Sequence, residues 1–547
     1  MEKEIAGLIP DFEQQLFYPG ILSISQGRIK QITRKQNSAE RLPYILPGFV
    51  DSHIHIESSM MVPSEFARLA VIHGTVGTVS DPHEIANVCG MEGVRYMLEN
   101  GKKVPFKFNF GAPSCVPATS FETAGARLDA NEVEELLQNP DIKYLSEMMN
   151  FPGVLNGDQQ VWEKIKQAKK LNKPIDGHAP GLRGKEAEEY IQAGISTDHE
   201  CFTYEEALDK LSKGMKIIIR EGSAAKNFDE LIDLLNDFPD HIMFCSDDKH
   251  PDSLIDGHIN LLCTRAMAKG IDIFKILRAA SINPVKHYAL DIGLLRTGDP
   301  ADFIVVEDLE SLEIKQTFID GQLVMESGRT QIDSVPIASI NNFHRNLLEV
   351  DELRFDYTAD VPEDLPIIEA LDGQLITLKS KINYQDLLDR QQLVSNPALD
   401  ILKIVVVDRY GKGHIGKAFV KNFGLKNGAI ASSVAHDSHN IVAVGTDDHS
   451  LEKAINAIIS TRGGLSFYQS SPNEIKEVIP LPIAGLMSDL DGFELAYEYT
   501  RLDKLVKEAG SKLSSPFMTL SFMALLVIPH IKLSDRGLFD ADHFQFI

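Results

Sequence analysis

Cysteine is scarce in this chain, and the few cysteines present form no recognisable motif. Five cysteines are spread over 547 residues, and no two of them form a C-x-x-C pair. A disulfide scaffold and a cysteine-rich zinc module are therefore excluded. The first five residues, MEKEI, are charged and lead into no long apolar run, so we expect no secretory signal. A reducing cytoplasm fits this pattern best.

Long apolar runs and an excess of positive charge are also missing. No stretch approaches the roughly 18 uninterrupted apolar residues that a membrane span requires. The chain has 54 Lys and Arg against 79 Asp and Glu, which gives a formal net charge of −25. Nucleic acids and anionic membrane surfaces both attract basic patches. We therefore expect neither a nucleic acid nor a membrane as a partner.

The sequence does contain a regular alternation of short apolar runs with amphipathic stretches. Its length predicts two to four domains at roughly 150 residues each. Eight strand-like runs separated by helical segments predict an α/β fold, a TIM-type (β/α)8 barrel. The expected strands are residues 44–50, 75–79, 105–110, 142–145, 174–175, 194–195, 215–219 and 241–245. The expected helices include residues 158–171, 185–192, 204–211 and 228–238.

The two regions that flank the barrel show alternating patterns typical of β-strands. Because barrel termini lie close in space, these flanks could pair into one small composite β domain. Strands and helices mix in the last third, which favours an α+β domain. We therefore expect a composite domain of residues 1–46 and 288–340, a barrel of residues 47–287, and a C-terminal domain of residues 341–547.

Two histidines at the end of the first barrel strand mark the candidate site. His53 and His55 lie two residues apart in PGFVDSHIHIE, so both side chains point to the same face of a strand. The C-terminal end of a barrel strand is where barrel enzymes carry their active site. A bare H-x-H is more often two polar residues at a strand end, so the pair needs partners.

Partners follow at matching positions on the later strands. Glu147 ends the fourth run, His178 the fifth, His199 the sixth and Asp247 the eighth. Each alone would more often be a loop residue or a helix N-cap. Burying so many ionisable groups together without a cation would be costly. We therefore predict two divalent metal ions bridged by Glu147, which activate a bridging hydroxide near neutral pH.

This order of ligands resembles the amidohydrolase superfamily of metal-dependent barrel hydrolases. Many members carry a carboxylated lysine on the fourth strand, where this chain has Glu147. Further segments resemble the bacterial adenine deaminase family: DPHEIANV after strand two, REGSAA after strand seven, SDDKHP after strand eight, and SVAHDSHNI near the C-terminus. The resemblance covers nearly the whole chain. It implies hydrolysis of adenine to hypoxanthine and ammonia in purine salvage, with Mn²⁺ or Fe²⁺ as the metal, and we expect a homo-oligomer, a dimer.

In the expected mechanism, Glu147 bridges the ions and Asp247 acts as the general acid–base. Asp247 accepts the proton of the attacking hydroxide and relays it to a ring nitrogen or to the departing amine. His83 and Glu84 after strand two could contact the substrate, or could contribute to a further metal or a proton relay. A helix N-terminal cluster is their plainer interpretation, because Asp81-Pro82 precedes a helix start.

Two more groups of polar residues have an open role. Arg220 and Glu221 could hold the edges of the purine ring, and a surface ion pair is an equally good interpretation. His436, Asp437 and His439 have the spacing of a solvated turn, whereas the family resemblance favours a lid that closes over the barrel mouth.

The candidate metal ligands are also compatible with other functions. A barrel hydrolase of the dihydroorotase or hydantoinase type, acting on a cyclic amide or N-acyl substrate, would use the same metal ligands. A metal-binding protein without turnover is the non-enzymatic alternative. A cytidine-type zinc deaminase is excluded, because its P-C-x-x-C motif is absent.

Overall fold

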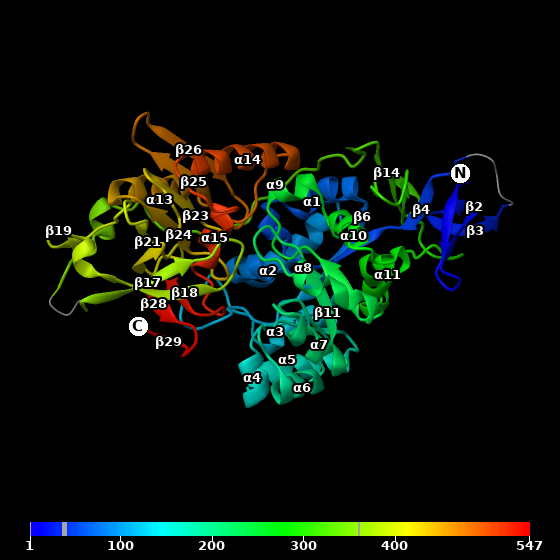
Figure 1. Ribbon diagram of the computed structural model, residues 1–547, viewed down its shortest axis with the longest axis horizontal. Coiled ribbons are helices and arrows are strands. Elements are labelled where there is room, and N and C mark those ends of the chain that lie inside the picture. The colour runs from blue at the N-terminus through cyan, green and yellow to red at the C-terminus, as the bar shows by residue number, and fades with distance from the viewer. Residues whose placement is uncertain (1, 36–40, 359–361) are drawn as a thin grey trace.

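The computed structural model of the chain describes residues 2–35, 41–358 and 362–547. A small sheet near the N-terminus lies at one end of the molecule, the barrel lies in the middle, and the C-terminal domain lies at the other end (Figure 1). Among the described residues, no helix is both long enough and apolar enough to cross a membrane.

Eight parallel strands form the barrel. Strands β5 to β9 make one sheet and β10 to β12 make another. Backbone hydrogen bonds join the last strand to the first, since the amide of Asp247 donates to the carbonyl of His53 at 3.0 Å. The predicted (β/α)8 barrel is therefore confirmed. Its strands are β5 Phe49–Ile54, β6 Thr75–Ser80, β7 Lys107–Ala112, β8 Ile142–Met148, β9 Ile175–Gly177, β10 Thr197–Asp198, β11 Lys216–Arg220 and β12 Ile242–Cys245.

Amphipathic helices surround the strands. In α5, Asp158 caps the N-terminus by accepting from the amide of Val161, and the helix buries Val161, Ile165 and Ala168. The predicted helix at residues 228–238 is divided into α8 and a 3-10 helix, Ile232–Asn236. The main helices are α1 Pro63–Ala70, α2 His83–Gly101, α3 Ala130–Gln138, α5 Gln159–Lys170, α6 Gly184–Gln192, α7 Tyr204–Ser212, α8 Phe228–Leu231 and α10 Ile259–Ala268.

The two flanks of the barrel pair into a single eight-stranded sheet. Strand β4 lies at its centre, parallel to β1 and antiparallel to β13. The single strand expected at residues 44–50 is wrong in part, because β4 ends at Pro47 and β5 starts the barrel at Phe49. Gly48 divides them where a Cβ atom would lie 2.4 Å from the Val76 side chain. The sheet contains β1 Lys3–Asp11, β2 Leu16–Ser25, β3 Arg28–Arg34, β4 Tyr44–Pro47, β13 Phe303–Val306, β14 Ile314–Ile319, β15 Gln322–Glu326 and β16 Arg329–Thr330.

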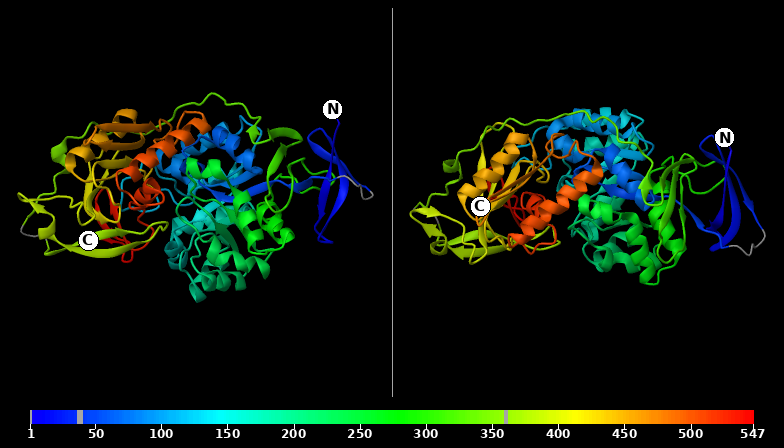
Figure 2. Two further views of the ribbon diagram at one scale, coloured as in Figure 1. Left: turned by 45° about the horizontal axis from the view of Figure 1, so that its top comes forward. Right: turned by 90° about the horizontal axis from the view of Figure 1, so that it is seen from above.

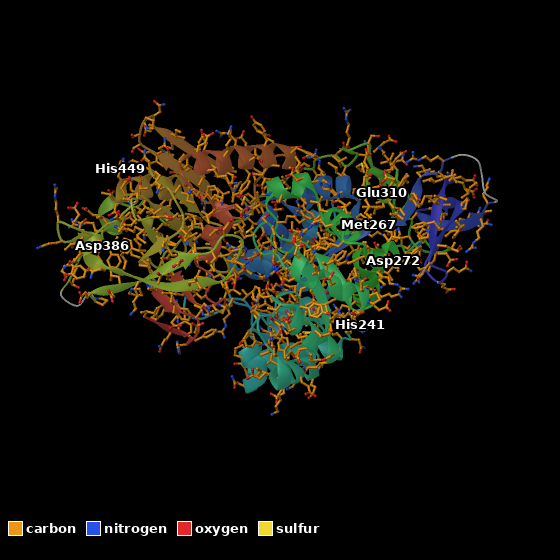
Figure 3. All side chains as sticks on the ribbon, viewed as in Figure 1. His241, Met267, Asp272, Glu310, Asp386 and His449 are labelled. Atoms are coloured by element: carbon orange, nitrogen blue, oxygen red, sulfur yellow. The ribbon has the colours of Figure 1, made fainter. Side chains whose placement is uncertain are left out.

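The C-terminal domain contains a second eight-stranded sheet. Helix α13, Asp448–Thr461, packs on its central strands, and its exposed His449 lies well away from the barrel (Figure 3). Helices α14, Gly492–Glu508, and α15, Pro516–Phe522, lie on the side that faces the barrel (Figure 2). In sheet order the strands are β18 Thr377–Asn383, β17 Asp364–Ala370, β22 Ile415–Lys421, β21 Ile401–Val407, β24 Ile441–Gly445, β23 Ala429–Ser432, β25 Gly464–Gln469 and β26 Ile475–Pro480.

Candidate metal centre

The six predicted metal ligands lie together at the C-terminal ends of the barrel strands. Two of them are the next-to-last residue of a strand, and four follow a strand within two residues. All six side chains are buried. The set consists of His53 on β5, His55 after β5, Glu147 on β8, His178 after β9, His199 after β10 and Asp247 after β12.

Glu147 lies between two pairs of histidines. Its Oε1 atom is 3.3 Å from His55 Nε2 and 3.9 Å from His53 Nε2. Its Oε2 atom is 2.8 Å from His178 Nδ1 and 3.3 Å from His199 Nε2. Oε1 also lies 3.4 Å from His83 Nδ1. One carboxylate whose two oxygens face separate groups of imidazoles is the arrangement that a bridging ligand needs.

The donor set fits divalent cations. The Nε2 atoms of His53 and His55 lie 3.2 Å apart, and His55 Nε2 is 3.3 Å from Asp247 Oδ1. Ligand atoms on metal bonds of about 2.1 Å are separated by about 3.4 Å in a tetrahedral site, whereas charge-assisted hydrogen bonds are about 2.7–2.9 Å long. His55 Nδ1 lies 3.2 Å from the carbonyl of Asp81, which can accept its proton and leave Nε2 free for a metal. Imidazole and carboxylate ligands of this kind suit Mn²⁺, Fe²⁺ or Zn²⁺.

Both carboxylates of the centre are held in the ionised form. Burial alone would raise the pKa of Glu147, but His178, His199 and His55 outweigh it and hold this pKa well below its ordinary value. Burial would also raise the pKa of Asp247, but Arg220 and nearby histidines hold it well below its ordinary value. Two buried carboxylates are therefore available as metal ligands at neutral pH.

Asp247 occupies an unusual backbone position at the barrel mouth. Its φ angle is 55°, in the left-handed region that residues other than glycine rarely adopt. Its Oδ2 atom accepts from Arg220 Nη1 at 2.8 Å, and its Oδ1 atom lies 3.5 Å from His53 Nε2. The side chain is thus fixed between a guanidinium and the histidines.

Arg220 and Glu221 point to different places. Arg220 is buried and pairs with two carboxylates. Its Nη1 atom donates to Asp247, and its Nη2 atom donates to Glu200 at 3.1 Å. Glu221 instead pairs with Arg265 at 2.7 Å and does not line the cavity. The sequence offered a surface ion pair for Arg220 and Glu221, but Glu221 has Arg265 as its partner and Arg220 is buried.

Sequence reasoning missed Glu200. Its Oε1 atom lies 3.4 Å from His199 Nε2 and 3.6 Å from His178 Nδ1. Burial alone would raise the pKa of Glu200, but Arg220, His178 and His199 lower it. The one available signal was its position directly after a predicted ligand.

Residues of the C-terminal domain close the mouth of the barrel. His436 and Asp437 line the same cavity as the metal ligands, and His439 hydrogen-bonds to Glu84. The cavity has a volume of about 30 Å³, enough for about two water molecules. Met149 of the barrel also lines the cavity, and the C-terminal domain contributes an apolar wall of four residues: Leu375, Leu525, Val527 and Ile528.

Two family profiles match the chain. The profile described as Amidohydrolase family matches residues 44–324, which include the composite sheet's central strand and the barrel. The profile described as Adenine deaminase C-terminal domain matches residues 374–545.

Curated relatives match over nearly the full length. An adenine deaminase of Sulfurovum sp. is 57% identical, with 98% of this chain and 97% of that protein covered. Those of Methanosarcina acetivorans and Borreliella burgdorferi are 50% and 48% identical, with at least 98% of each chain covered. Among solved structures, a β-aspartyl dipeptidase of Fervidobacterium islandicum matches 62% of this chain and 100% of its own at 15% identity and a TM-score of 0.46.

Proposed function

Because the chain belongs to the adenine deaminase family of the amidohydrolases, we propose that its barrel site hydrolyses adenine to hypoxanthine and ammonia. The observation that supports this most is Glu147, whose two carboxylate oxygens face separate pairs of histidines. The family gives the substrate, and this geometry gives the class of chemistry.

Bound divalent cations would activate a water molecule for attack on C6 of the purine and would stabilise the charge that develops there. His53, His55, His178, His199, Glu147 and Asp247 would hold these ions. Asp247 is ionised, so its carboxylate can accept the proton of the attacking water and pass it to the substrate. Arg220 positions this carboxylate through its hydrogen bond to Oδ2.

The C-terminal domain completes the substrate pocket. The flat face of the purine would pack against Leu375, Leu525, Val527 and Ile528, while its polar edge faces the metal centre. Glu200 lies at that edge, with Arg220 holding its carboxylate in place. Because the cavity is too small for a purine in this conformation, the apolar wall has to move to admit the substrate and then closes to exclude water.

The proposal also includes the identity of the metal and the oligomeric state of the chain. Nitrogen and oxygen ligands accept several divalent metals, and we propose Mn²⁺ or Fe²⁺. All five cysteines are free, which is compatible with a reducing cytoplasm. The homodimer stays a prediction, and sedimentation analysis would test it.

A substrate panel tests the proposed function. Chain produced with Mn²⁺ while iron is chelated is assayed for ammonia release from adenine, with dihydroorotate and a β-aspartyl dipeptide as control substrates. Turnover of adenine alone is expected. Turnover of the cyclic amide or the dipeptide, with none of adenine, would assign the site to another reaction of the same metal chemistry.

A further inference from the structure

A second cluster of metal-binding side chains lies beside the barrel centre. It forms where the start of helix α2 meets the loop at residues 433–440 of the C-terminal domain. Its members are at most 4% exposed. Two come from the barrel, His83 and Glu84, and two come from the C-terminal domain, His436 and Asp437.

The donor atoms converge on one carboxylate oxygen. Glu84 Oε1 lies 3.2 Å from His436 Nε2 and 3.3 Å from His83 Nε2. His83 Nε2 lies 3.8 Å from Asp437 Oδ1, and the donor atoms of His83, Glu84 and Asp437 all lie within 4.8 Å of one another. The two contacts of Glu84 Oε1 are longer than charge-assisted hydrogen bonds of about 2.7–2.9 Å. They are similar to three spacings in the barrel centre, which lie at 3.2–3.5 Å: His53 to His55, His53 to Asp247, and His55 to Glu147.

The other ring nitrogen of each histidine has its own hydrogen-bond partner. His83 Nδ1 lies 3.0 Å from the Asp81 carboxylate, and His436 Nδ1 lies 2.5 Å from Ser521 Oγ. A carboxylate or hydroxyl that accepts the Nδ1 proton leaves the Nε2 lone pair free. This is the arrangement of a histidine metal ligand with its supporting partner. Both Nε2 atoms face Glu84.

His439 shows the opposite pattern and serves as an internal contrast. Its Nδ1 atom accepts from the backbone amide of Ala435 at 3.2 Å, so the ring proton is on Nε2. Nε2 therefore donates to Glu84 Oε2 and cannot bind a metal. This hydrogen bond fixes the carboxylate and aims its Oε1 atom at His83 and His436.

We propose that His83, Glu84, His436 and Asp437 bind a third divalent transition-metal ion, which joins the barrel to the C-terminal domain. Two imidazoles and two carboxylates form a donor set for Mn²⁺, Fe²⁺ or Zn²⁺. The ion shares no ligand with the barrel centre. Under this proposal, His83 and Glu84 bind a metal ion and do not contact the substrate, which was the other role that the sequence offered for them.

Counting bound ions tests the proposal. Wild type, His436→Gln, Glu147→Gln and the double variant are stripped of metal, reconstituted with Mn²⁺, desalted and analysed by inductively coupled plasma mass spectrometry. We expect three ions per wild-type chain and one fewer in His436→Gln. We expect Glu147→Gln to keep one ion that the double variant loses.

A matched control and a second variant keep the result interpretable. The exposed His449→Gln controls for the loss of any histidine, and Asp437→Asn replaces His436→Gln if that variant does not fold. Equal counts in His436→Gln and wild type, or in the double variant and Glu147→Gln, would overturn the third site. The count does not depend on adenine turnover, so failure of the proposed function leaves this test intact.

Discussion

Two buried glutamates organise the charged side chains where the barrel meets the C-terminal domain. Glu147 lies among the histidines of the barrel centre, and Glu84 lies among His83, His436 and His439. In both, burial alone would raise the pKa, and the neighbouring histidines lower it well below its ordinary value. Each glutamate is therefore a buried anion that needs positive charge beside it, from metal ions or from imidazolium groups.

Lys532 is a buried cation in a different situation. Its ammonium group donates to the carbonyls of Leu375 at 2.6 Å and Phe522 at 3.0 Å, two segments next to the cavity. Burial lowers its pKa from 10.5 to about 7. Between these values the unfolded chain binds more protons than the folded chain, so stability rises with pH across this window.

Replacing Lys532 with Met should remove this pH dependence. Between pH 6 and pH 9, the free energy of unfolding of wild type should rise by up to about 3 kcal/mol relative to that of Lys532→Met. The variant also loses two hydrogen bonds, which adds a difference that does not change with pH. Scanning calorimetry at both pH values measures the shift. Lys504→Met, on the exposed face of α14, should show no such change. An equal difference at both pH values for Lys532→Met would contradict the low pKa.

At the scale of elements, the apolar wall of the cavity should determine how tightly the substrate binds. Leu525→Ala removes apolar area against the purine face and should raise KM for adenine roughly tenfold, with kcat less affected. Leu388→Ala is the matched control, since Leu388 is 40% exposed in the same domain. Steady-state kinetics compares the two variants. An unchanged KM for Leu525→Ala would place the purine elsewhere.

Element positions were predictable where the local pattern was strong. The strands expected at residues 75–79, 142–145 and 241–245 match β6, β8 and β12 closely, because each is a continuous apolar run. The break at Gly48 was not predictable, since it depends on the close approach of Val76 from the neighbouring strand. Strand β10 is only two residues long, Thr197–Asp198, and the strand expected at residues 194–195 is misplaced, because so short a strand carries little apolar pattern of its own.

At the scale of the whole molecule, the convergence of the six candidate ligands was predictable and their surroundings were not. Parallel strands end at one edge, so the six strand-end residues were expected together. Contacts between distant segments have no such rule: His439 and Glu84 are 355 residues apart in the chain. The apolar wall was not predictable from the sequence, because Leu525 and Ile528 are apolar residues that cannot be told from ordinary core residues. Only the folded chain brings the C-terminal domain over the barrel.

Under the proposed function, Glu147 bridges the metal ions on which adenine hydrolysis depends. Metal content and adenine turnover are measured together on wild type and Glu147→Gln, with the exposed Glu310→Gln, whose position Figure 3 labels, as the control. Glu147→Gln should lose the ions of the barrel centre and at least roughly a hundredfold in turnover together, while Glu310→Gln keeps both. Full turnover by Glu147→Gln with the ions of the barrel centre retained would contradict the account.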